Sequence, residues 1–337
     1  MGTAIILFGA GASYGSDERG TPPLGSALFN KLAAFGDGAW GLVSGSEADA
    51  FRTDFEQGMR TYAESHATDG TVDLLQRAMA AYFFTFQPRA TSLYVKFARW
   101  ILQTGLNGAV VSLNYERMLE LSLRGVGLNV ITGEPSSNSI ELCLPHGCCH
   151  LFCNIRTDHG SGIRPSVNLV SQGPVILKSG KRPDGTDVTI TLRTQQGGPI
   201  FFGPDVRLDS EETRIIDEPD QHAKELRESA VPPVMCYFQP DKKTRSGVSF
   251  IENQRQRFVD LVRLASSVAI VGVKVRAHDR HLWDPLARTS ARLVYCAGEA
   301  GASEFEAWAK THGRSGDLAI PAFWDHGFDE ICEALMH

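Results

Sequence analysis

The chain has 337 residues, of which 42% are hydrophobic and 21% charged, and its formal net charge at pH 7 is -6. These proportions exclude bulk disorder, and the acidic balance disfavours a general nucleic-acid-binding protein. No apolar run approaches the roughly 20 residues that span a bilayer, and the apolar stretch at residues 4–8 is too short for a signal peptide. We therefore expect a soluble, cytoplasmic protein that contacts neither a membrane nor nucleic acid directly.

Four short apolar runs are typical of strands buried on both faces of a parallel sheet, and helical patterns separate them. The expected strands are residues 3–8, 108–113, 267–272 and 291–296. The expected helices are residues 24–32, 118–124, 258–265 and 303–310. Buried strands that alternate with helices predict an α/β fold with a doubly wound, Rossmann-like parallel sheet.

Two segments depart from this alternation, so we expect one domain over residues 1–337 that carries two insertions. Residues 40–104 have a helical apolar stripe and predict a helical insertion. Residues 151–229 are polar and predict a partly β insertion, with a hairpin whose strands flank a Pro-Asp-Gly turn at 183–185. The expected core is residues 1–39, 105–150 and 230–337.

A glycine-rich turn, residues 9–15, follows the first expected strand. Glycines at such a turn let the backbone approach a pyrophosphate, whose charge helix N–H groups can bind. The spacing Gly-x-Gly-x-x-x-Gly differs from the dehydrogenase fingerprint, and no acidic residue follows at the usual distance. A tight strand-to-helix turn without a ligand therefore stays open as an alternative.

Two further residues have side chains suited to ligand binding or acid–base catalysis. Asn114 ends the second expected strand, at the edge where open α/β sheets bind ligands, although Asn is also a favoured helix N-cap. His146 lies in a short loop beside Gly147, and it is either structural or an acid–base group.

These segments together resemble the sirtuin NAD-consuming family. Residues 9–13, 113–116 and 146–147 occur in that family's order and rough spacing. Residues 270–275, followed by 278–281, resemble its nucleotide-contacting late strand and loop. The variant resembled most is the bacterial sirtuin-like group of antiphage defence proteins, in which the strand-end motif reads Asn-Tyr-Asp.

The resemblance implies that Asn114 and His146 are catalytic and that NAD+ is the substrate. It also implies a set of nucleotide-binding residues: Gly9, Ala10, Gly11, Ala12, Ser13, Thr21, Pro22, Glu116, Gly147, Gly272, Val273, Asp279 and His281. The chain departs from the family at Glu116, where the family has Asp.

The cysteine pattern is a second departure, from the protein-deacylating sirtuins. Those proteins carry two Cys-x-x-Cys pairs that bind zinc, and this chain has none. Its cluster is Cys143, Cys148, Cys149 and Cys153. That spacing does not fit a zinc ribbon, so we expect small buried thiols and no metal.

The expected reaction is hydrolysis of NAD+ to nicotinamide and ADP-ribose, with the neutral histidine assisting proton loss from the nucleophile. The family resemblance implies an antiphage effector that depletes NAD+, a homo-oligomer, and an activating partner such as a HerA-type ATPase or a short Argonaute. A deacylase and a non-catalytic NAD or ADP-ribose binding module are alternatives. A preference between NAD and NADP stays open.

Overall fold

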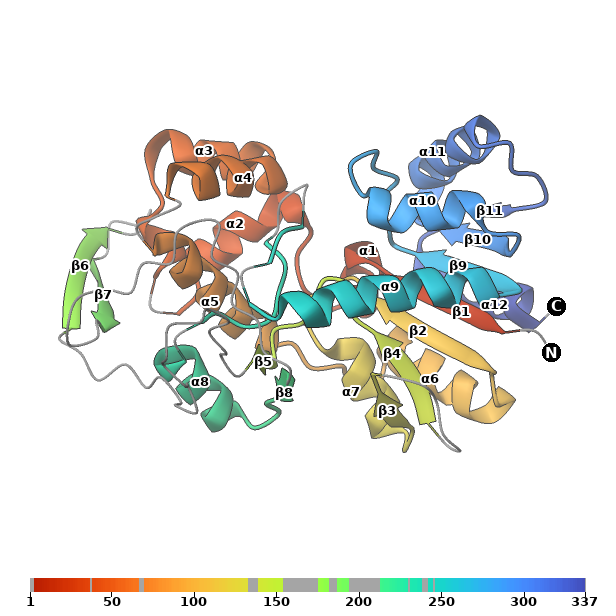
Figure 1. Ribbon diagram of the computed structural model, residues 1–337, viewed down its shortest axis with the longest axis horizontal. Coiled ribbons are helices and arrows are strands. Elements are labelled where there is room, and N and C mark those ends of the chain that lie inside the picture. Colours follow the sequence, from red (N-terminus) through yellow and green to blue (C-terminus); the bar gives the residue numbers. More distant parts are fainter. Residues whose placement is uncertain are drawn as a thin grey trace, which may run out of the picture. The chain divides into compact units, whose positions relative to one another are not determined.

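The computed structural model describes residues 3–36, 38–66, 70–132, 139–153, 175–181, 187–193, 213–229, 231–237, 242–244 and 246–336 (Figure 1). The chain divides into two compact units, and each is built from separate stretches of sequence. The first comprises residues 1–22, 86–146 and 252–337. The second comprises residues 23–85 and 147–251.

The first unit is built on a seven-stranded sheet with the order β11-β10-β9-β1-β2-β4-β3. All six pairs of neighbouring strands are parallel. The strands are β1 (Ala4–Phe8), β2 (Gly108–Ser112), β3 (Asn129–Ile131), β4 (Ser139–Cys143), β9 (Ser267–Val271), β10 (Arg292–Cys296) and β11 (Leu318–Ile320). The predicted parallel α/β sheet is confirmed.

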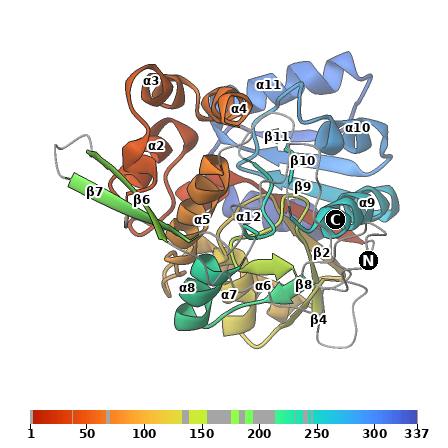
Figure 2. The same ribbon diagram turned by 60° about the vertical axis from the view of Figure 1, so that its left-hand side comes forward.

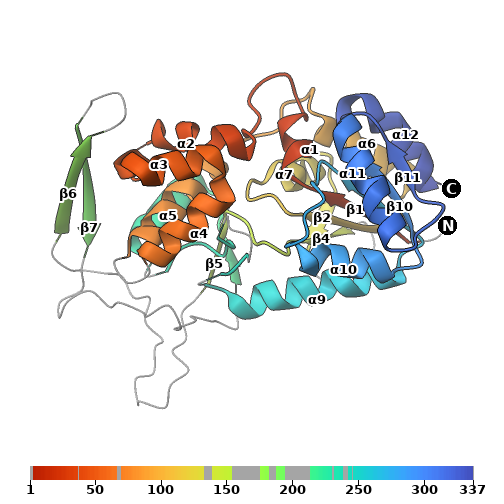
Figure 3. The same cartoon turned by 90° about the horizontal axis from the view of Figure 1, so that it is seen from above.

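Helices cover both faces of this sheet, as Figure 3 shows for α9 and α10 on one side and α6 and α12 on the other. Successive side chains of a strand point to opposite faces, so Leu7 and Phe8 of β1 enter different cores. Leu7 packs in the cluster that contains Phe258 and Leu282. The ring of Phe8 lies 5.1 Å from that of Phe97 and 5.2 Å from that of Trp324. The sheet is therefore doubly wound.

The helices of this unit are α1 (Ala10–Tyr14), α6 (Leu93–Thr104), α7 (Met118–Gly125), α10 (Arg280–Arg288), α11 (Gly298–Thr311) and α12 (Trp324–Met336), together with most of α9 (Val248–Leu264). None of the described helices is long and apolar enough to cross a membrane.

The described part of the second unit is mainly helical. Its helices are α2 (Gly25–Ala33), η1 (Trp40–Leu42), α3 (Gly45–Thr53), α4 (Phe55–Ser65), α5 (Thr71–Phe84) and α8 (Pro219–Glu228). The helices α2, α3 and α4 lie together (Figure 2) and enclose an aromatic core, in which Phe29 stacks on Phe51 at 5.5 Å and Trp40 donates its indole N–H to the Leu75 carbonyl.

Two antiparallel strand pairs complete the second unit. They are β5 (Leu151–Cys153) with β8 (Thr213–Ile215), and β6 (Val175–Lys181) with β7 (Asp187–Arg193). The pair β6–β7 is the hairpin predicted from the sequence, and its Pro-Asp-Gly turn lies outside the described residues. Residues 23–39, expected in the core, group with the helical segment, whereas α6, expected in the helical insertion, groups with the sheet.

The central strand β1 lies between β2 and β9, so the chain leaves β1 toward one side of the sheet and returns on the other. The turns that follow β1 and β9 touch each other through their backbones. The Gly11 amide donates to the Gly272 carbonyl at 3.0 Å, and the Gly9 amide donates to the Val271 carbonyl at 2.9 Å. This strand edge is where doubly wound sheets bind their ligands.

Replacement of Gly272 by Ala should be strongly destabilising. Gly272 has φ +65°, and an added Cβ would collide with the backbone nitrogen of Ala12. Left-handed backbone and overpacking together predict a loss of about 2–5 kcal/mol in unfolding free energy. Gly313 is a matched control, because its φ is +66° but nothing lies within 4 Å of the added carbon. Gly313→Ala should lose only about 1–2 kcal/mol. Urea unfolding of both variants measures the difference, and equal losses would contradict the backbone contact.

Candidate functional site at the carboxyl edge of the sheet

Asn114 follows β2 directly and is buried, with 7% of its surface exposed. Its Nδ2 donates to the Gly9 carbonyl at 3.2 Å and to Ser13 Oγ at 2.8 Å. A carbonyl can only accept, so the nitrogen of the amide must face the glycine turn. The amide oxygen is thereby turned away from these partners, and it is the atom that can accept from a bound hydroxyl or water.

A buried polar network fixes that orientation. Ser13 Oγ donates to Glu116 Oε1 at 2.5 Å and lies 2.8 Å from the Tyr94 hydroxyl. A serine hydroxyl has one proton, which Glu116 receives, so the Tyr94 hydroxyl donates to Ser13. The Tyr94 oxygen in turn lies 3.4 Å from Asn114 Nδ2, as an acceptor. Four side chains from α1, α6 and the loop after β2 are thus connected in one network.

Glu116 connects this network to α7. Its Oε2 accepts from the Met118 amide at 2.5 Å, near the start of that helix, and its other oxygen accepts from Ser13. Burial raises the pKa of Glu116 above its usual value, and the hydrogen bonds from Ser13, Met118 and Asn114 oppose this effect. The sequence led us to expect Glu116 to contact a nucleotide. The structure shows that both carboxylate oxygens already accept bonds from the protein.

His146 follows β4 and is buried, with 4% of its surface exposed. Its Nδ1 lies 3.3 Å from the carbonyl oxygen of Leu113, the residue before Asn114. Its Nε2 lies 2.8 Å from Nε2 of His281. The bond to Leu113 brings the histidine loop to the end of β2, and therefore brings the two predicted catalytic residues to the same part of the sheet edge.

The late loop after β9 holds the other predicted residues of this unit. The Tyr295 hydroxyl donates to the Val273 carbonyl at 2.6 Å. Asp279 is buried and precedes α10, where its carbonyl accepts from the amides of Leu282 and Trp283 at 2.9 Å and 3.0 Å. His281 is the second residue of α10 and is partly exposed. Of these residues, His281 is joined by a side-chain hydrogen bond to His146, one of the two residues predicted to be catalytic.

The other residues predicted to bind the nucleotide lie in different local environments. Gly9 and Gly11 face the backbone of Gly272, where an added Cβ would lie 2.7 Å or 3.0 Å from the Gly272 carbonyl oxygen. This packing requires glycine at position 9 and leaves little room for a side chain at position 11. Thr21 and Pro22 lie in the loop before α2, and Pro22 is buried. Ala10 is exposed, whereas Ala12 is buried.

Gly147 belongs to the second unit. It forms an isolated bridge to Met235, and its φ of +74° places the missing Cβ against the Val234 carbonyl. The backbone therefore requires glycine here, directly after His146.

Tyr94 is the member of the site that the sequence did not reveal. It lies on α6 among apolar residues at helical spacing, so its pattern is that of a core residue. Its pKa is raised well above the usual value, first by burial and second by the neighbouring Glu116. The only signal in the sequence is a hydroxyl at a position that the pattern predicts to be buried, and buried hydroxyls need partners.

The predicted cysteine cluster is buried, as expected, and its four cysteines form no disulfide. Cys148, Cys149 and His150 have potential ligand atoms within 4.8 Å of one another. Burial raises the pKa of the Cys148 thiol well above its usual value. The expectation of no metal stays a prediction, which metal analysis of the purified protein would test.

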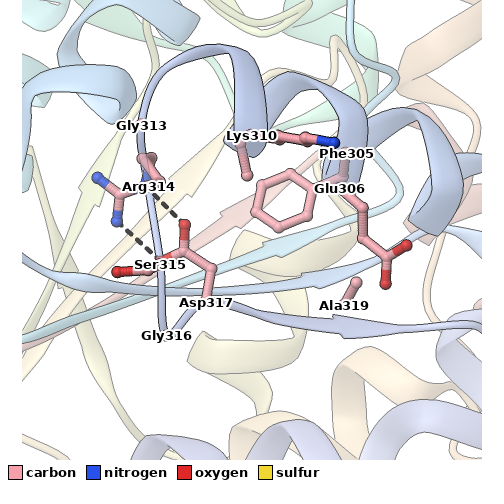
Figure 4. Close-up of a pocket in the computed structure, with 10 residues that line it drawn as sticks. Phe305, Glu306, Lys310, Gly313, Arg314, Ser315, Gly316, Asp317 and Ala319 are labelled. Atoms are coloured by element: carbon pink, nitrogen blue, oxygen red, sulfur yellow. Dashed lines mark hydrogen bonds and ion pairs between the residues drawn. The ribbon is translucent and has the colours of Figure 1, made fainter.

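A surface hollow lies at the opposite edge of the sheet, between the end of α11 and the start of β11 (Figure 4). Arg314 lines it, but the guanidinium donates to the carbonyls of Leu286, Thr289 and Ala291 and to both carboxylate oxygens of Asp317. All five N–H groups of the arginine are therefore used. This arginine holds the α10–β10 connection in place and is not available to bind an anion.

Comparison with known proteins gives no family assignment. No family model and no curated protein matches the chain. Among solved structures, a Sir2 homologue in complex with NAD is similar at 12% identity and a TM-score of 0.43, over 99% of this chain and 89% of that one. A mutant Sir2 homologue with ADP-ribose has 12% identity and a TM-score of 0.41, over 99% and 92%. Likeness at this level does not establish a function, which must be argued from the site.

Replacement of Glu116 by Gln should change how stability depends on pH. An acid whose pKa is raised by folding favours the folded state when protonated, and this contribution is lost as pH rises above 4.5 through the folded pKa. Glu116→Gln removes the titration but keeps both bonds, because its oxygen can accept from Met118 and its nitrogen can donate to Ser13. The variant should therefore lose less stability than wild type as pH rises above 4.5.

Glu299→Gln is the control for this comparison, since Glu299 is exposed in the same unit. Denaturant unfolding at a series of pH values measures all three proteins. The burial argument is wrong if Glu116→Gln and Glu299→Gln follow the same pH curve.

Proposed function

We propose that the protein hydrolyses NAD+ to nicotinamide and ADP-ribose. One observation carries this proposal: His146 is hydrogen-bonded to the carbonyl of the residue before Asn114, at the sheet edge next to the glycine turn. Two groups that the reaction needs, an oriented amide and an imidazole, are thereby held together. The family resemblance of the sequence supports the same reaction.

The chemistry fits these groups. Nicotinamide leaves from NAD+ as a neutral molecule, because the electron pair of the broken C1′–N bond cancels the pyridinium charge. Departure leaves an oxocarbenium-like ribose, as in glycoside hydrolysis. The protein must then hold a water near C1′ and take its proton. The amide oxygen of Asn114 can accept from a ribose hydroxyl or from that water, and the histidine pair provides the base.

The resemblance also supports a biological role as an antiphage effector that depletes NAD+. An activity that depletes NAD+ must be inhibited until infection occurs. We propose that assembly into a homo-oligomer, or an activating partner such as a HerA-type ATPase or a short Argonaute, provides this control.

Two alternatives predict different results with purified protein. A deacylase would release nicotinamide only with an acylated peptide. A binding module would bind NAD+ or ADP-ribose without turnover. The binding module is favoured by Glu116, whose carboxylate serves the protein's own Ser13 and Met118.

Replacement of Asn114 or His146 by Ala should abolish most turnover. Loss of an acid–base imidazole lowers rates by about 10²–10⁴-fold, so kcat/KM of His146→Ala should fall by about that factor. Loss of a positioned hydrogen-bonding group costs about 10²–10³-fold, which is the fall expected for Asn114→Ala. Nicotinamide release from NAD+, measured by chromatography, gives the rates, and circular dichroism checks folding.

The control for these variants is His326→Ala, an exposed histidine on α12, which should keep the wild-type rate. The proposal is wrong if wild type releases no nicotinamide in any oligomeric state, with or without a partner. Release that requires an acylated peptide would favour the deacylase instead.

A further inference from the structure

The family resemblance predicts that Ser13 contacts the nucleotide, but the structure gives its hydroxyl three partners within the protein. Ser13 Oγ accepts from Asn114 Nδ2 at 2.8 Å and donates to Glu116 Oε1 at 2.5 Å. It also lies 2.8 Å from the hydroxyl of Tyr94. A hydroxyl group has one proton and two lone pairs, so three hydrogen bonds are its full capacity. Ser13 is moreover 1% exposed, so these partners leave no hydrogen-bonding capacity for a nucleotide.

Asn114 is the residue of the predicted catalytic pair that Ser13 contacts. The bond from Asn114 Nδ2 to Ser13 Oγ, at 2.8 Å, is shorter than its bond to the Gly9 carbonyl, at 3.2 Å. The bond to the Tyr94 hydroxyl, at 3.4 Å, is longer than usual. Every side-chain hydrogen bond that Asn114 makes within the described residues uses the nitrogen, and the amide oxygen is not fully buried. The bond to Ser13 therefore does most to keep that oxygen turned toward a ligand.

Tyr94 contacts Ser13 from a closely packed aromatic core. Its side chain is buried, and its ring lies 5.4 Å from the ring of Phe8 and 4.8 Å from that of Trp324, edge-on to both. Phenylalanine would fill the same space without the cost of burying a hydroxyl. The hydroxyl is the difference between the two residue types, and its shortest bond is to Ser13. Rigid packing of the ring thus places a hydrogen-bonding group beside Ser13.

We propose that Tyr94 and Ser13 are positioning residues, which hold the amide oxygen of Asn114 toward the substrate and do not bind the nucleotide. This inference rests on the proposed NAD+ hydrolysis. In that reaction the substrate side of Asn114 must present an acceptor, and the amide oxygen is its only acceptor. Without the Tyr94 hydroxyl, Ser13 loses one of its three bonds and holds Nδ2 less firmly. The amide then samples orientations in which its oxygen no longer faces the substrate.

Tyr94→Phe keeps the packed ring and removes the hydroxyl, so it tests the positioning role directly. Loss of a supporting hydrogen bond behind a functional side chain costs about 10–100-fold, so kcat should fall by about that factor. KM should stay within about 3-fold of wild type, because neither residue binds the substrate. Ser13→Ala should show the same division between kcat and KM. A large rise in KM with unchanged kcat in Ser13→Ala would show that Ser13 binds the nucleotide, and would overturn the inference.

A double variant shows whether Tyr94 acts through Ser13. In a Ser13→Ala background, Tyr94→Phe should lower kcat by less than about 3-fold further, because the bond that it would remove is already absent. Single-variant losses that multiply in full would show that the two residues act independently. That result would contradict the proposed connection from Tyr94 through Ser13 to Asn114.

Tyr295→Phe is the matched control for loss of a buried hydroxyl. Tyr295 is buried as completely as Tyr94, and its hydroxyl donates to the Val273 carbonyl at 2.6 Å. Urea unfolding of the two variants measures how much stability each hydroxyl contributes. If Tyr94→Phe is destabilised as much as Tyr295→Phe but keeps the wild-type kcat, then Tyr94 has a structural role alone and the inference is wrong.

A measurement that needs no turnover separates this inference from the proposed function. The side-chain NH2 signals of Asn114 in a proton–nitrogen NMR spectrum can be identified by their loss in Asn114→Ala. These signals should move in Tyr94→Phe and in Ser13→Ala, and should stay near their wild-type positions in Tyr295→Phe. Unmoved signals in Tyr94→Phe would overturn the inference whether or not the protein cleaves NAD+. The expected shifts in a protein that does not cleave NAD+ would overturn the proposed function alone.

Discussion

The backbone contact between the turns after β1 and β9 is the constraint on which the candidate site depends. Gly9 and Gly11 lie against Gly272 so closely that a Cβ on any of the three would meet backbone atoms. The contact fixes where the glycine turn ends and α1 begins. It also fixes the start of the loop that leads from β9 to His281. The same backbone contact therefore positions both the glycine turn and the loop that carries His281.

The polar network after β2 follows from this contact. Asn114 is oriented by the Gly9 carbonyl and by Ser13, both of which belong to the glycine turn or to α1. Ser13 in turn depends on Glu116 and Tyr94 for its other bonds. Buried polar groups are costly unless each has a partner, so the members of such a network hold one another in place. Asn114 thus has a fixed orientation before any ligand binds.

Glu116 connects two helices of the fold, although its place in the sequence indicated a ligand contact. Its two carboxylate oxygens reach two different elements, Ser13 on α1 and the Met118 amide at the start of α7. Burial raises the pKa of this carboxyl group, and its hydrogen bonds offset part of that effect. Both carboxylate oxygens of Glu116 therefore serve the fold at this position.

The parts of the fold that could be predicted are those with a local pattern. The strands near residues 4–8, 108–112 and 267–271 are continuous apolar runs, and each is found within one residue or so of its predicted bounds. The short edge strands β3 and β11 have three residues each, too few for a periodic pattern, and the sequence did not indicate them. The grouping of α6 with the sheet depends on contacts between distant residues, such as Phe97 with Phe8, which no local pattern encodes.

The same limit explains which site residues could be found. Asn114 and His146 occur in short motifs next to strand ends, where ligand-binding residues are expected. Tyr94 has no motif, because its role comes from a hydroxyl that meets Ser13 across 81 positions of sequence. The partnership of His146 with His281 joins residues 135 positions apart, and only the packed sheet edge brings them together. A residue type in a motif predicts that chemistry is present, whereas the partners of that residue follow from contacts between distant parts of the chain.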